Sequence, residues 1–380
     1  MKYGQAEMLH GKNNNYMFEE IYKNKKVLVT GHTGFKGTWL VSWLLKLGAD
    51  VAGYSIGIPT TPSHFVELNI ESKIKHFIGD IRNYDQFYAA VDEFKPEFIF
   101  HLAAQPLVRE SYFDPKGTFE VNMSGTLNVL ETIRHFSDVV KVGVIITSDK
   151  AYDNVEWLYG YREDDKLGGE DPYSGSKGAA ELITKSYMHS FFNSGFPNIV
   201  TTRAGNVIGG GDWAKDRIVP DIVRSWSENN SVNIRNPFST RPWQHVLEPL
   251  SGYLCLGAKL YQNSDFKNSS FNFGPDSKIN KNVGELIDEM SKNWSSSPGW
   301  INQYIDDGKP EANLLKLCCD KANILLNWYP VLDFQETIFY TVNWYLNYYQ
   351  EKISVFDFTQ NQIEMYALKA RENGIDWAIK

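Results

Sequence analysis

Short apolar runs alternate with helical patterns through the first half of the chain. The runs, each typical of a buried strand, cover residues 25–30, 50–55, 74–78, 98–103, 142–147 and 199–203. Between them, apolar residues recur at the spacing of a helix, and helices are predicted over residues 38–47, 85–94, 117–136 and 178–192. This alternation predicts an α/β fold, with a doubly wound parallel sheet covered by helices on both faces.

The pattern becomes irregular after about residue 206, where glycine, proline and tryptophan are frequent. Helices are predicted there at 219–226, 249–261 and 283–293. We expect a smaller, mixed α/β lobe above the carboxyl ends of the sheet strands, where open α/β sheets bind ligands. The expected division is a flexible extension over residues 1–17, a sheet domain mainly over 18–205, and a lobe mainly over 206–380, with some of its elements returning to the sheet domain.

Composition narrows the class of protein. The 380 residues include 46 acidic and 38 basic side chains, a net charge of −8, which disfavours a nucleic-acid-binding protein. No uncharged apolar stretch reaches the roughly 18 residues of a membrane-spanning helix, and the polar N-terminus lacks the apolar region of a signal peptide. Three cysteines, Cys255, Cys318 and Cys319, suit reduced thiols, so we expect a cytoplasmic protein.

A glycine-rich turn separates the first predicted strand from the first predicted helix. Gly31, Gly34 and Gly37 form G-x-x-G-x-x-G there, within a strand–helix–strand unit. Glycines at these positions permit a tight turn and a close backbone approach, so that a pyrophosphate can bind the helix N-terminus. The motif therefore predicts a dinucleotide site in a Rossmann-type fold.

The choice of dinucleotide rests on weaker signals. NAD sites usually carry an acidic residue at the end of the second strand, but that strand ends here at Ser55. Asp80 and Ile81 follow the third strand and are expected to flank the adenine. We favour NAD because no clamp for a 2′-phosphate is evident, although His32, Lys36 and Ser55 leave NADP open.

Candidate catalytic side chains follow the strand predicted at 142–147. Ser148 stands at its carboxyl end, and Tyr173 and Lys177 lie four residues apart, on one face of a helix. A lysine cation beside a phenol favours the phenolate, which can accept a hydroxyl proton. Ser148 is placed to hydrogen-bond the reacting oxygen. A tyrosine and lysine at this spacing on their own would more often form a solvated helix face.

These motifs together resemble a known family. G-H-T-G-F-K-G, H-L-A-A-Q (residues 101–105), V-N-M-S-G-T (121–126) and Y-x-x-x-K are similar to the nucleotide-sugar branch of the extended short-chain dehydrogenase/reductases. The longer T-S-D-K-A-Y-D-N, R-A-G-N-V-I-G-G-G-D-W and R-P-W-Q-H-V-L-E-P-L motifs resemble the CDP-glucose 4,6-dehydratases. The resemblance runs from about residue 18 to beyond residue 330.

The resemblance implies a three-stage reaction on CDP-glucose with NAD. Tyr173 takes a proton from the 4-hydroxyl as hydride leaves carbon 4, water is lost across carbons 5 and 6, and hydride returns to carbon 6. Asp149 is expected to protonate the leaving 6-hydroxyl and Lys150 to remove the proton from carbon 5, where many relatives have glutamate. The alternative for Asp149 and Lys150 is an exposed ion pair.

The same resemblance assigns binding roles to further residues. Asn122 corresponds to the asparagine of the family's catalytic tetrad, with a helix-turn cap as its alternative. Asn206, Arg217 and Arg241 lie in motifs that bind the nucleotide diphosphate in relatives, and arginines suit its phosphates; the alternative for each is a surface position. Arg109, Glu110 and Ser111 follow the fourth strand and are expected to line the sugar pocket. The expected cofactor set adds Thr33, Phe35, Lys36, Leu102, Ala103, Ala104, Gln105 and Asn122, and the expected substrate set is Arg109, Ser148, Asn206, Arg217 and Arg241.

Other readings remain open at this point. An epimerase, or a dehydratase of dTDP-, UDP- or GDP-sugars, would share the fold, and base selection rests on the resemblance alone. A cofactor-sensing binding protein would have no use for Tyr173 and Lys177. The eight histidines show no metal-ligand spacing, so no metal is expected. The helices around 117–136 and 173–192 are expected to pair into a homodimer or homotetramer.

Overall fold

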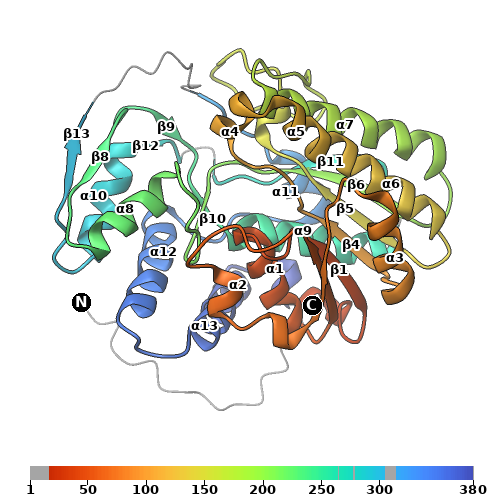
Figure 1. Ribbon diagram of the computed structural model, residues 1–380, viewed down its shortest axis with the longest axis horizontal. Coiled ribbons are helices and arrows are strands. Elements are labelled where there is room, and N and C mark those ends of the chain that lie inside the picture. Colours follow the sequence, from red (N-terminus) through yellow and green to blue (C-terminus); the bar gives the residue numbers. More distant parts are fainter. Residues whose placement is uncertain (1–16, 264, 277–278, 304–313, 380) are drawn as a thin grey trace.

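The protein is built on a seven-stranded, all-parallel sheet (Figure 1). The computed structural model describes residues 17–379 except 264, 277–278 and 304–313. The strand order is β11-β6-β5-β4-β1-β2-β3. The chain therefore adds β2 and β3 on one side of β1 and then β4, β5 and β6 on its other side, so the strand order reverses between β1 and β4. The strands are β1 (Lys26–Thr30), β2 (Asp50–Ser55), β3 (Lys75–Ile78), β4 (Phe98–His101), β5 (Val142–Ile146), β6 (Asn198–Arg203) and β11 (Ser269–Asn272).

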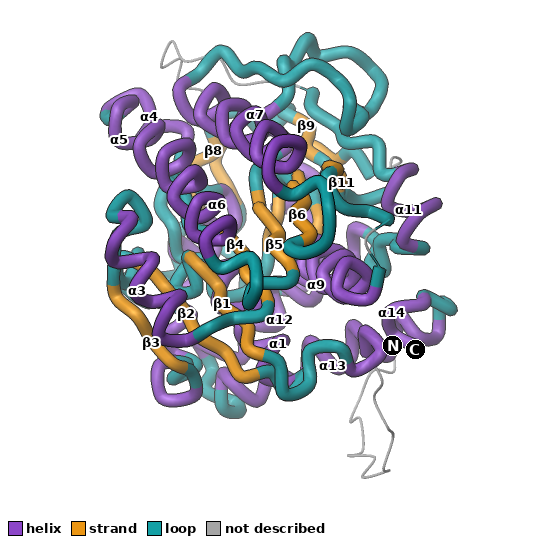
Figure 2. The backbone as a smooth tube through the Cα atoms, turned by 90° about the vertical axis from the view of Figure 1, so that its right-hand side faces the viewer, coloured by secondary structure: helices purple, strands orange, loops and turns teal. Residues whose placement is uncertain are grey.

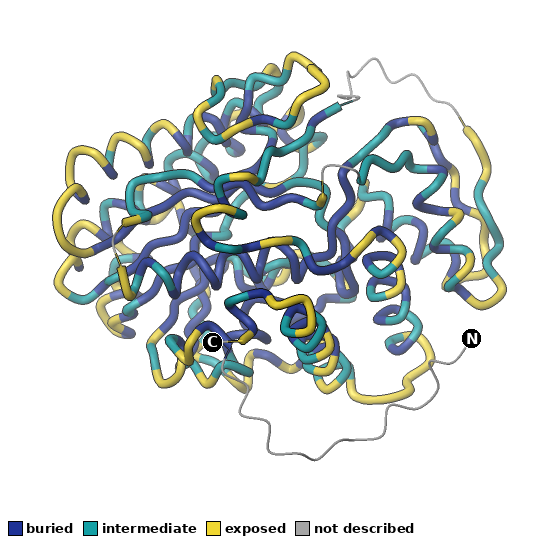
Figure 3. The backbone as a smooth tube through the Cα atoms, turned by 180° about the vertical axis from the view of Figure 1, so that it is seen from behind, coloured by how far each residue is buried: buried dark blue, intermediate teal, exposed yellow. Residues whose placement is uncertain are grey.

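Helices cover both faces of this sheet, as the alternating pattern predicts. In Figure 2, α3 (Tyr84–Phe94), α6 (Gly125–His135) and α7 (Pro172–Phe191) lie in front of the strands. The opposite face is covered by α1 (Phe35–Lys46) and α9 (Leu247–Gln262), whose apolar side chains join one large core. The central strands are buried on both sides, and all five residues of β5 are buried (Figure 3).

A smaller lobe stands beside the carboxyl ends of the strands (Figure 1). It contains three two-stranded sheets, β7 with β10, β9 with β12, and β8 with β13. Its helix α10 (Val283–Asn293) packs against α12 (Phe334–Tyr349), and α8 (Ile218–Ser227) packs against the strand β8. The strands are β7 (Val207–Ile208), β8 (Val232–Ile234), β9 (Thr240–Arg241), β10 (Gln244–His245), β12 (Lys281–Asn282) and β13 (Trp300–Asn302).

Short helices complete the connections. They are η1 (Met17–Glu20), α2 (His64–Glu67), η2 (Glu71–Lys73), α4 (Val108–Phe113), α5 (Pro115–Phe119), η3 (Glu120–Ser124), η4 (Asp149–Ala151), α11 (Asp320–Leu326) and α14 (Asp376–Ile379). The helix predicted over 117–136 is divided, because η3 is a π-helical turn between α5 and α6. Residues 1–16 of the expected extension lie outside the described residues, and Met17 is buried.

Some elements that follow residue 206 return to the sheet domain, as the expected division allowed. α9 and β11 both come after this residue, yet α9 packs against β5 and β6, and β11 extends the main sheet. The long α13 (Val355–Glu372) packs against α1, where Lys46 pairs with Glu364 at 2.8 Å. The second half of the chain therefore completes both the lobe and the core of the sheet domain.

The two ends of the described chain meet in an aromatic cluster. Phe18 stacks on Trp377 with ring centroids 5.0 Å apart, and Trp377 also stacks on Tyr366 and meets Trp43 edge-on. Trp377 is 4% exposed. This contact joins η1, α1, α13 and α14 into one buried unit.

We predict that Trp377→Ala destabilises the whole fold. Removing a buried tryptophan costs about 3–5 kcal/mol, because transfer free energy is lost and a cavity remains. Urea unfolding followed by circular dichroism should show a clearly lower midpoint. Trp157→Ala, at a site 42% exposed, is the matched control and should change stability by less than about 0.5 kcal/mol. Equal midpoints for the two variants would contradict the structural role of the cluster.

Candidate active site

The glycine turn forms a close-packed cradle between β1 and β4. Gly31 has φ +71°, and a Cβ added to it would lie 2.7 Å from the backbone nitrogen of Ala103. A Cβ on Gly37 would lie 2.2 Å from the carbonyl oxygen of Gly31. The Thr30 hydroxyl accepts from the Ala103 N–H at 3.1 Å and so joins the two loops. The predicted neighbours of the cofactor, 31–37 and 102–105, thus meet where the strand order reverses.

The start of α1 fits an anionic ligand. Its N-cap is Gly34, which offers no side-chain acceptor, and its first turn has no acidic residue. The first N–H groups of a helix carry partial positive charge and need acceptors from outside the helix. A dinucleotide pyrophosphate supplies such acceptors, so Gly34, Phe35 and Lys36 are suited to hold one.

The end of β2 is occupied by neutral, hydrogen-bonded groups. The His32 ring contacts the Ser55 hydroxyl at 3.0 Å and the His76 ring at 2.7 Å. Burial, together with the neighbouring His76, lowers the pKa of His32 to about 3. The Thr33 hydroxyl donates to the carbonyl of Gly57 at 2.6 Å. The β2 end therefore presents hydroxyl and carbonyl groups, and His32 contributes no cation that would hold a 2′-phosphate.

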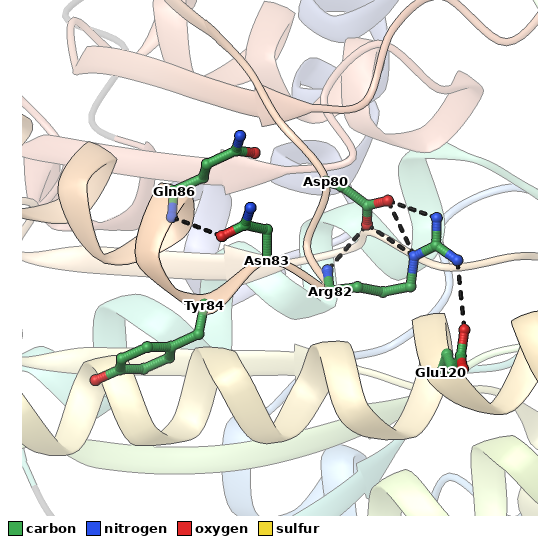
Figure 4. Close-up of a pocket in the computed structure, with 6 residues that line it drawn as sticks. All are labelled: Asp80, Arg82, Asn83, Tyr84, Gln86 and Glu120. Carbon is green, nitrogen blue, oxygen red and sulfur yellow. Dashed lines mark hydrogen bonds and ion pairs between the residues drawn. The ribbon is translucent and has the colours of Figure 1, made fainter.

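Asp80 lies at the β3 edge, beside a surface hollow of about 660 Å³ (Figure 4). The Arg82 guanidinium donates hydrogen bonds to both oxygens of the Asp80 carboxylate, the shortest at 2.6 Å, and forms an ion pair with Glu120 at 3.5 Å. The hydrogen bond from Arg82 lowers the pKa of Asp80. Ile81 turns its side chain into the core, where it packs near Gly125. The cofactor roles of Asp80 and Ile81 stay predictions.

The candidate catalytic residues gather at the end of β5. Ser148 caps η4, where its hydroxyl accepts from the Lys150 N–H at 3.3 Å and donates to the Asp149 carboxylate at 3.0 Å. Asp149 is 5% exposed and Lys150 is half-buried, and no ion pair joins them in the described structure. The burial of Asp149 removes the alternative of an exposed ion pair.

Helix α7 brings Tyr173 to Ser148. The helix begins with Pro172 in its first turn, and the Asp171 side chain caps it by accepting from the Ser174 N–H at 2.9 Å. Burial raises the pKa of Tyr173 to about 12, and Asp149 acts in the same direction. A hydrogen bond with Ser148 and the charge of Arg217 oppose this rise. Burial outweighs both effects, so the phenolate expected from the Tyr173–Lys177 spacing is not favoured in this structure, and the cation that opposes burial is Arg217, not Lys177.

Three cations converge on this site. Burial and the nearby Lys36 together lower the pKa of Lys177 to about 8, and Glu181 opposes this change. Burial and the nearby Arg217 lower the pKa of Lys36 to about 8, whereas Asp149 raises it. Lys36 therefore faces the catalytic group as well as the glycine cradle. Like-charge repulsion among buried cations favours binding of an anion between them.

Asn122 connects the β4 loop to α7. Its side-chain oxygen accepts from the Gln105 N–H at 2.8 Å, and its amide donates to the Gln105 carbonyl at 3.1 Å and to Ser176 at 2.9 Å. The Ser176 hydroxyl donates to the carbonyl of Tyr173 at 2.7 Å. Asn122 is thus neither a helix cap nor exposed, and it positions the tyrosine-bearing turn.

The predicted substrate residues lie around the mouth of the lobe. Arg217 pairs with Asp212 at 3.0 Å, and Arg109 of α4 reaches Asp216 at 3.8 Å, so two arginines flank the segment before α8. Asn206 has φ 50° and follows the sheet directly. Arg241 lies in β9 and donates to the carbonyl of Thr240 at 2.8 Å. Their substrate roles remain predictions.

Several residues around the site escaped the sequence reasoning. A Cβ on Gly205 would lie 1.8 Å from an Asp149 oxygen, so this glycine makes room for the carboxylate. Tyr253 of α9 is fully buried, and burial together with the nearby Asp149 and Tyr173 raises the pKa of its hydroxyl. Glu181 forms a buried ion pair with Arg203 at 2.8 Å. Of these residues, only Glu181 could have been found from the sequence, because it stands one helical turn after Lys177.

Among the described residues, no group of three or more His, Cys, Asp or Glu side chains is placed to hold a metal ion. No described helix is both long and apolar enough to cross a bilayer.

Comparison with known proteins reveals relatives along most of the chain. Residues 28–340 match the family described as GDP-mannose 4,6 dehydratase. CDP-glucose 4,6-dehydratase from Salmonella typhimurium is 46% identical over 332 residues, which cover 86% of this chain and 92% of that protein. CDP-paratose 2-epimerase from Salmonella typhi is 29% identical over 276 residues, covering 66% and 78%.

Solved structures share the fold. UDP-glucose 4-epimerase from Thermus thermophilus, solved with NAD, has a TM-score of 0.72 at 24% identity and covers 86% of this chain and 100% of that chain. dTDP-glucose 4,6-dehydratase from Bacillus anthracis, also solved with NAD, has a TM-score of 0.70 at 18% identity, covering 88% and 99%. These matches confirm the predicted Rossmann-type α/β fold. Because the family match spans most of the chain and the Salmonella typhimurium dehydratase is 46% identical over 332 aligned residues, the chain belongs to the GDP-mannose 4,6 dehydratase family of sugar-nucleotide dehydratases.

Proposed function

We propose that this protein is a CDP-glucose 4,6-dehydratase, a hydro-lyase that converts CDP-glucose to CDP-4-keto-6-deoxyglucose and water with NAD as its cofactor. The observation that carries the proposal is the meeting of Ser148, Asp149 and Tyr173 beside the glycine cradle. The 46% identity to the Salmonella typhimurium enzyme supports the choice of substrate. The NAD-bound relatives and the neutral β2 end support the choice of cofactor.

The first step needs a base for the 4-hydroxyl. Tyr173 takes this proton once its own hydroxyl has lost a proton, which the hydrogen bond between Ser148 and the Tyr173 hydroxyl and the charge of Arg217 favour against the effect of burial. NAD held in the cradle by the glycine turn and the start of α1 would supply the hydride acceptor for carbon 4 and the hydride donor for carbon 6. Lys36 and Lys177 hold positive charge next to the reacting sugar and the cradle.

The second step removes water from the 4-keto sugar. Lys150 takes the proton from carbon 5, which the adjacent ketone has acidified, and Asp149 gives a proton to the departing 6-hydroxyl. Burial of Asp149 against Gly205 keeps this exchange away from solvent. An epimerase needs no such pair, so Asp149 and Lys150 favour a dehydratase.

The proposal extends to the protein's setting. We infer a homodimer or homotetramer, supported by apolar side chains exposed on α6 and α7, namely Leu127, Leu182 and Phe191. Free cysteines support the cytoplasm as its compartment. A 4-keto-6-deoxysugar is a precursor for deoxysugars, so we place the enzyme in polysaccharide biosynthesis of the O-antigen kind.

The first prediction concerns the substrate. Incubation with NAD and, in turn, CDP-glucose, dTDP-glucose, UDP-glucose and GDP-mannose should give loss of one water from CDP-glucose, detected by mass spectrometry. Dehydration of only another sugar nucleotide would overturn the substrate assignment. Failure with all four would leave an epimerase or a binding protein as the better explanation.

The second prediction concerns Tyr173. Tyr173→Phe should lower kcat by about 10²–10⁴-fold, because the proton acceptor is removed while the ring still fills its space. Steady-state assays with the substrate identified above measure this. Tyr159→Phe, at an exposed tyrosine of a nearby loop, is the control and should leave kcat unchanged. Full turnover by Tyr173→Phe would refute the role of its hydroxyl.

The third prediction separates oxidation from elimination. Asp149→Asn should slow water loss more than oxidation, because the amide has no acidic proton to give. Reduced cofactor should then accumulate in a single turnover, visible by its absorbance. Asp153→Asn, which removes a partner of Lys166 in the same loop, should accumulate none. Equal slowing of both steps by Asp149→Asn would count against the acid role.

A further inference from the structure

Glu181 lies beneath the catalytic centre and connects three elements. It stands on α7, and its carboxylate accepts hydrogen bonds from the hydroxyls of Thr147, at the end of β5, and Thr201, in β6, the latter at 2.7 Å. Its side chain is 2% exposed. Thr147 is the residue before Ser148, so one carboxylate fixes the helix that bears Tyr173 against the strand end that bears Ser148.

Arg203 completes this buried network. Its guanidinium donates to both Glu181 oxygens, at 2.8 and 2.9 Å, in a bidentate pair. It also donates to the Tyr152 hydroxyl at 2.6 Å and to the Glu163 carbonyl at 2.9 Å. The Glu181 carboxylate therefore accepts hydrogen bonds from two threonine hydroxyls and from two nitrogens of the Arg203 guanidinium.

The same carboxylate faces Lys177. Glu181 follows Lys177 by one helical turn, so both side chains lie on one face of α7, and both are buried. Glu181 is the anion that opposes the effects of burial and of Lys36 on the Lys177 ammonium. A negative charge one helical turn away, in a buried site, favours the charged lysine.

We propose that Glu181 is a positioning residue of the active site, which holds α7 against the ends of β5 and β6 and keeps Lys177 protonated during turnover. The hydrogen bonds to Thr147, Thr201 and Arg203 fix the geometry, and the negative charge maintains the ammonium. This inference rests on the proposed function for its kinetic consequence, although the charge state of Lys177 is measurable without any substrate.

Other charged groups near Lys177 act against Glu181. Lys36 faces it from α1, and the ring of His101 lies near it on β4, held between Thr30 and Thr126. Burial and the nearby Lys177 lower the pKa of His101 to about 3, so this ring is neutral. Arg203 neutralises Glu181 from the side of the sheet. Without Glu181, Lys177 would face only cations and a neutral imidazole among these groups.

The test is a pH titration of Lys177 in the full-length protein without ligands. The chemical shift of its ε-methylene carbon, observed with isotope-labelled lysine and assigned through Lys177→Arg, reports the ammonium. Glu181→Gln should lower the titration midpoint by about one pH unit or more. Glu181→Asp retains the charge and should restore more than half of this shift.

A matched control and a second variant keep the test decisive. Glu163→Gln removes another half-buried carboxylate near Arg203 and should leave the Lys177 midpoint in place. If Glu181→Gln leaves Arg203 unpaired and fails to fold, Glu181→Gln combined with Arg203→Met removes both charges and should still lower the midpoint. An unchanged midpoint in the folded variant, or an equal shift in Glu163→Gln, would overturn the proposal.

Kinetics give an independent readout. Activity requires the ammonium, so the alkaline limb of the kcat profile should move to lower pH in Glu181→Gln by the shift seen in the titration. A purely structural role would lower kcat at every pH and leave the limb in place. If the wild-type protein shows no activity but Glu181→Gln still shifts the Lys177 midpoint, only the proposed reaction is refuted, because the titration needs no substrate.

Discussion

The parallel arrangement of the main sheet is the constraint on which the rest of this protein depends. Because every strand runs the same way, the carboxyl ends of β1, β4, β5 and β6 all reach one edge. The glycine cradle, the β4 loop and Ser148 therefore meet without any of them being close in sequence. A parallel sheet also has to be covered on both faces, which places α1 and α7 at that edge from opposite sides.

Close backbone contact at this edge leaves little freedom for side chains. Gly31 and Gly37 allow the β1 loop to touch the β4 loop, and Gly205 leaves space for the Asp149 carboxylate. Where side chains are present, they hydrogen-bond to fixed partners, as Asn122 does to Gln105 and Ser176. These glycines and Asn122 therefore fix the backbone at this edge, and the candidate catalytic side chains are held in place by it.

Charge at the site differs from the charge of the whole chain. The protein carries a net charge of −8, yet Lys36, Lys177 and Arg217 gather around the proposed site. Burial of the two lysines, together with the repulsion between like charges, lowers the pKa of both. An anionic cofactor and an anionic sugar nucleotide relieve that repulsion, so the site is matched to its proposed ligands by local charge.

The sequence by itself determined the alternating strands and helices, the glycine turn, and the candidates Ser148, Tyr173 and Lys177, since these depend on local periodicity and short motifs. Six predicted strands match the structure within about two residues at either end. Only the tertiary structure placed β11 and α9 in the sheet domain and α13 against α1, since their apolar faces do not show which partner buries them. It also decided that Glu181 meets Arg203 and that Arg217 faces Tyr173, because such contacts between distant residues arise only when the parallel strands bring their ends together.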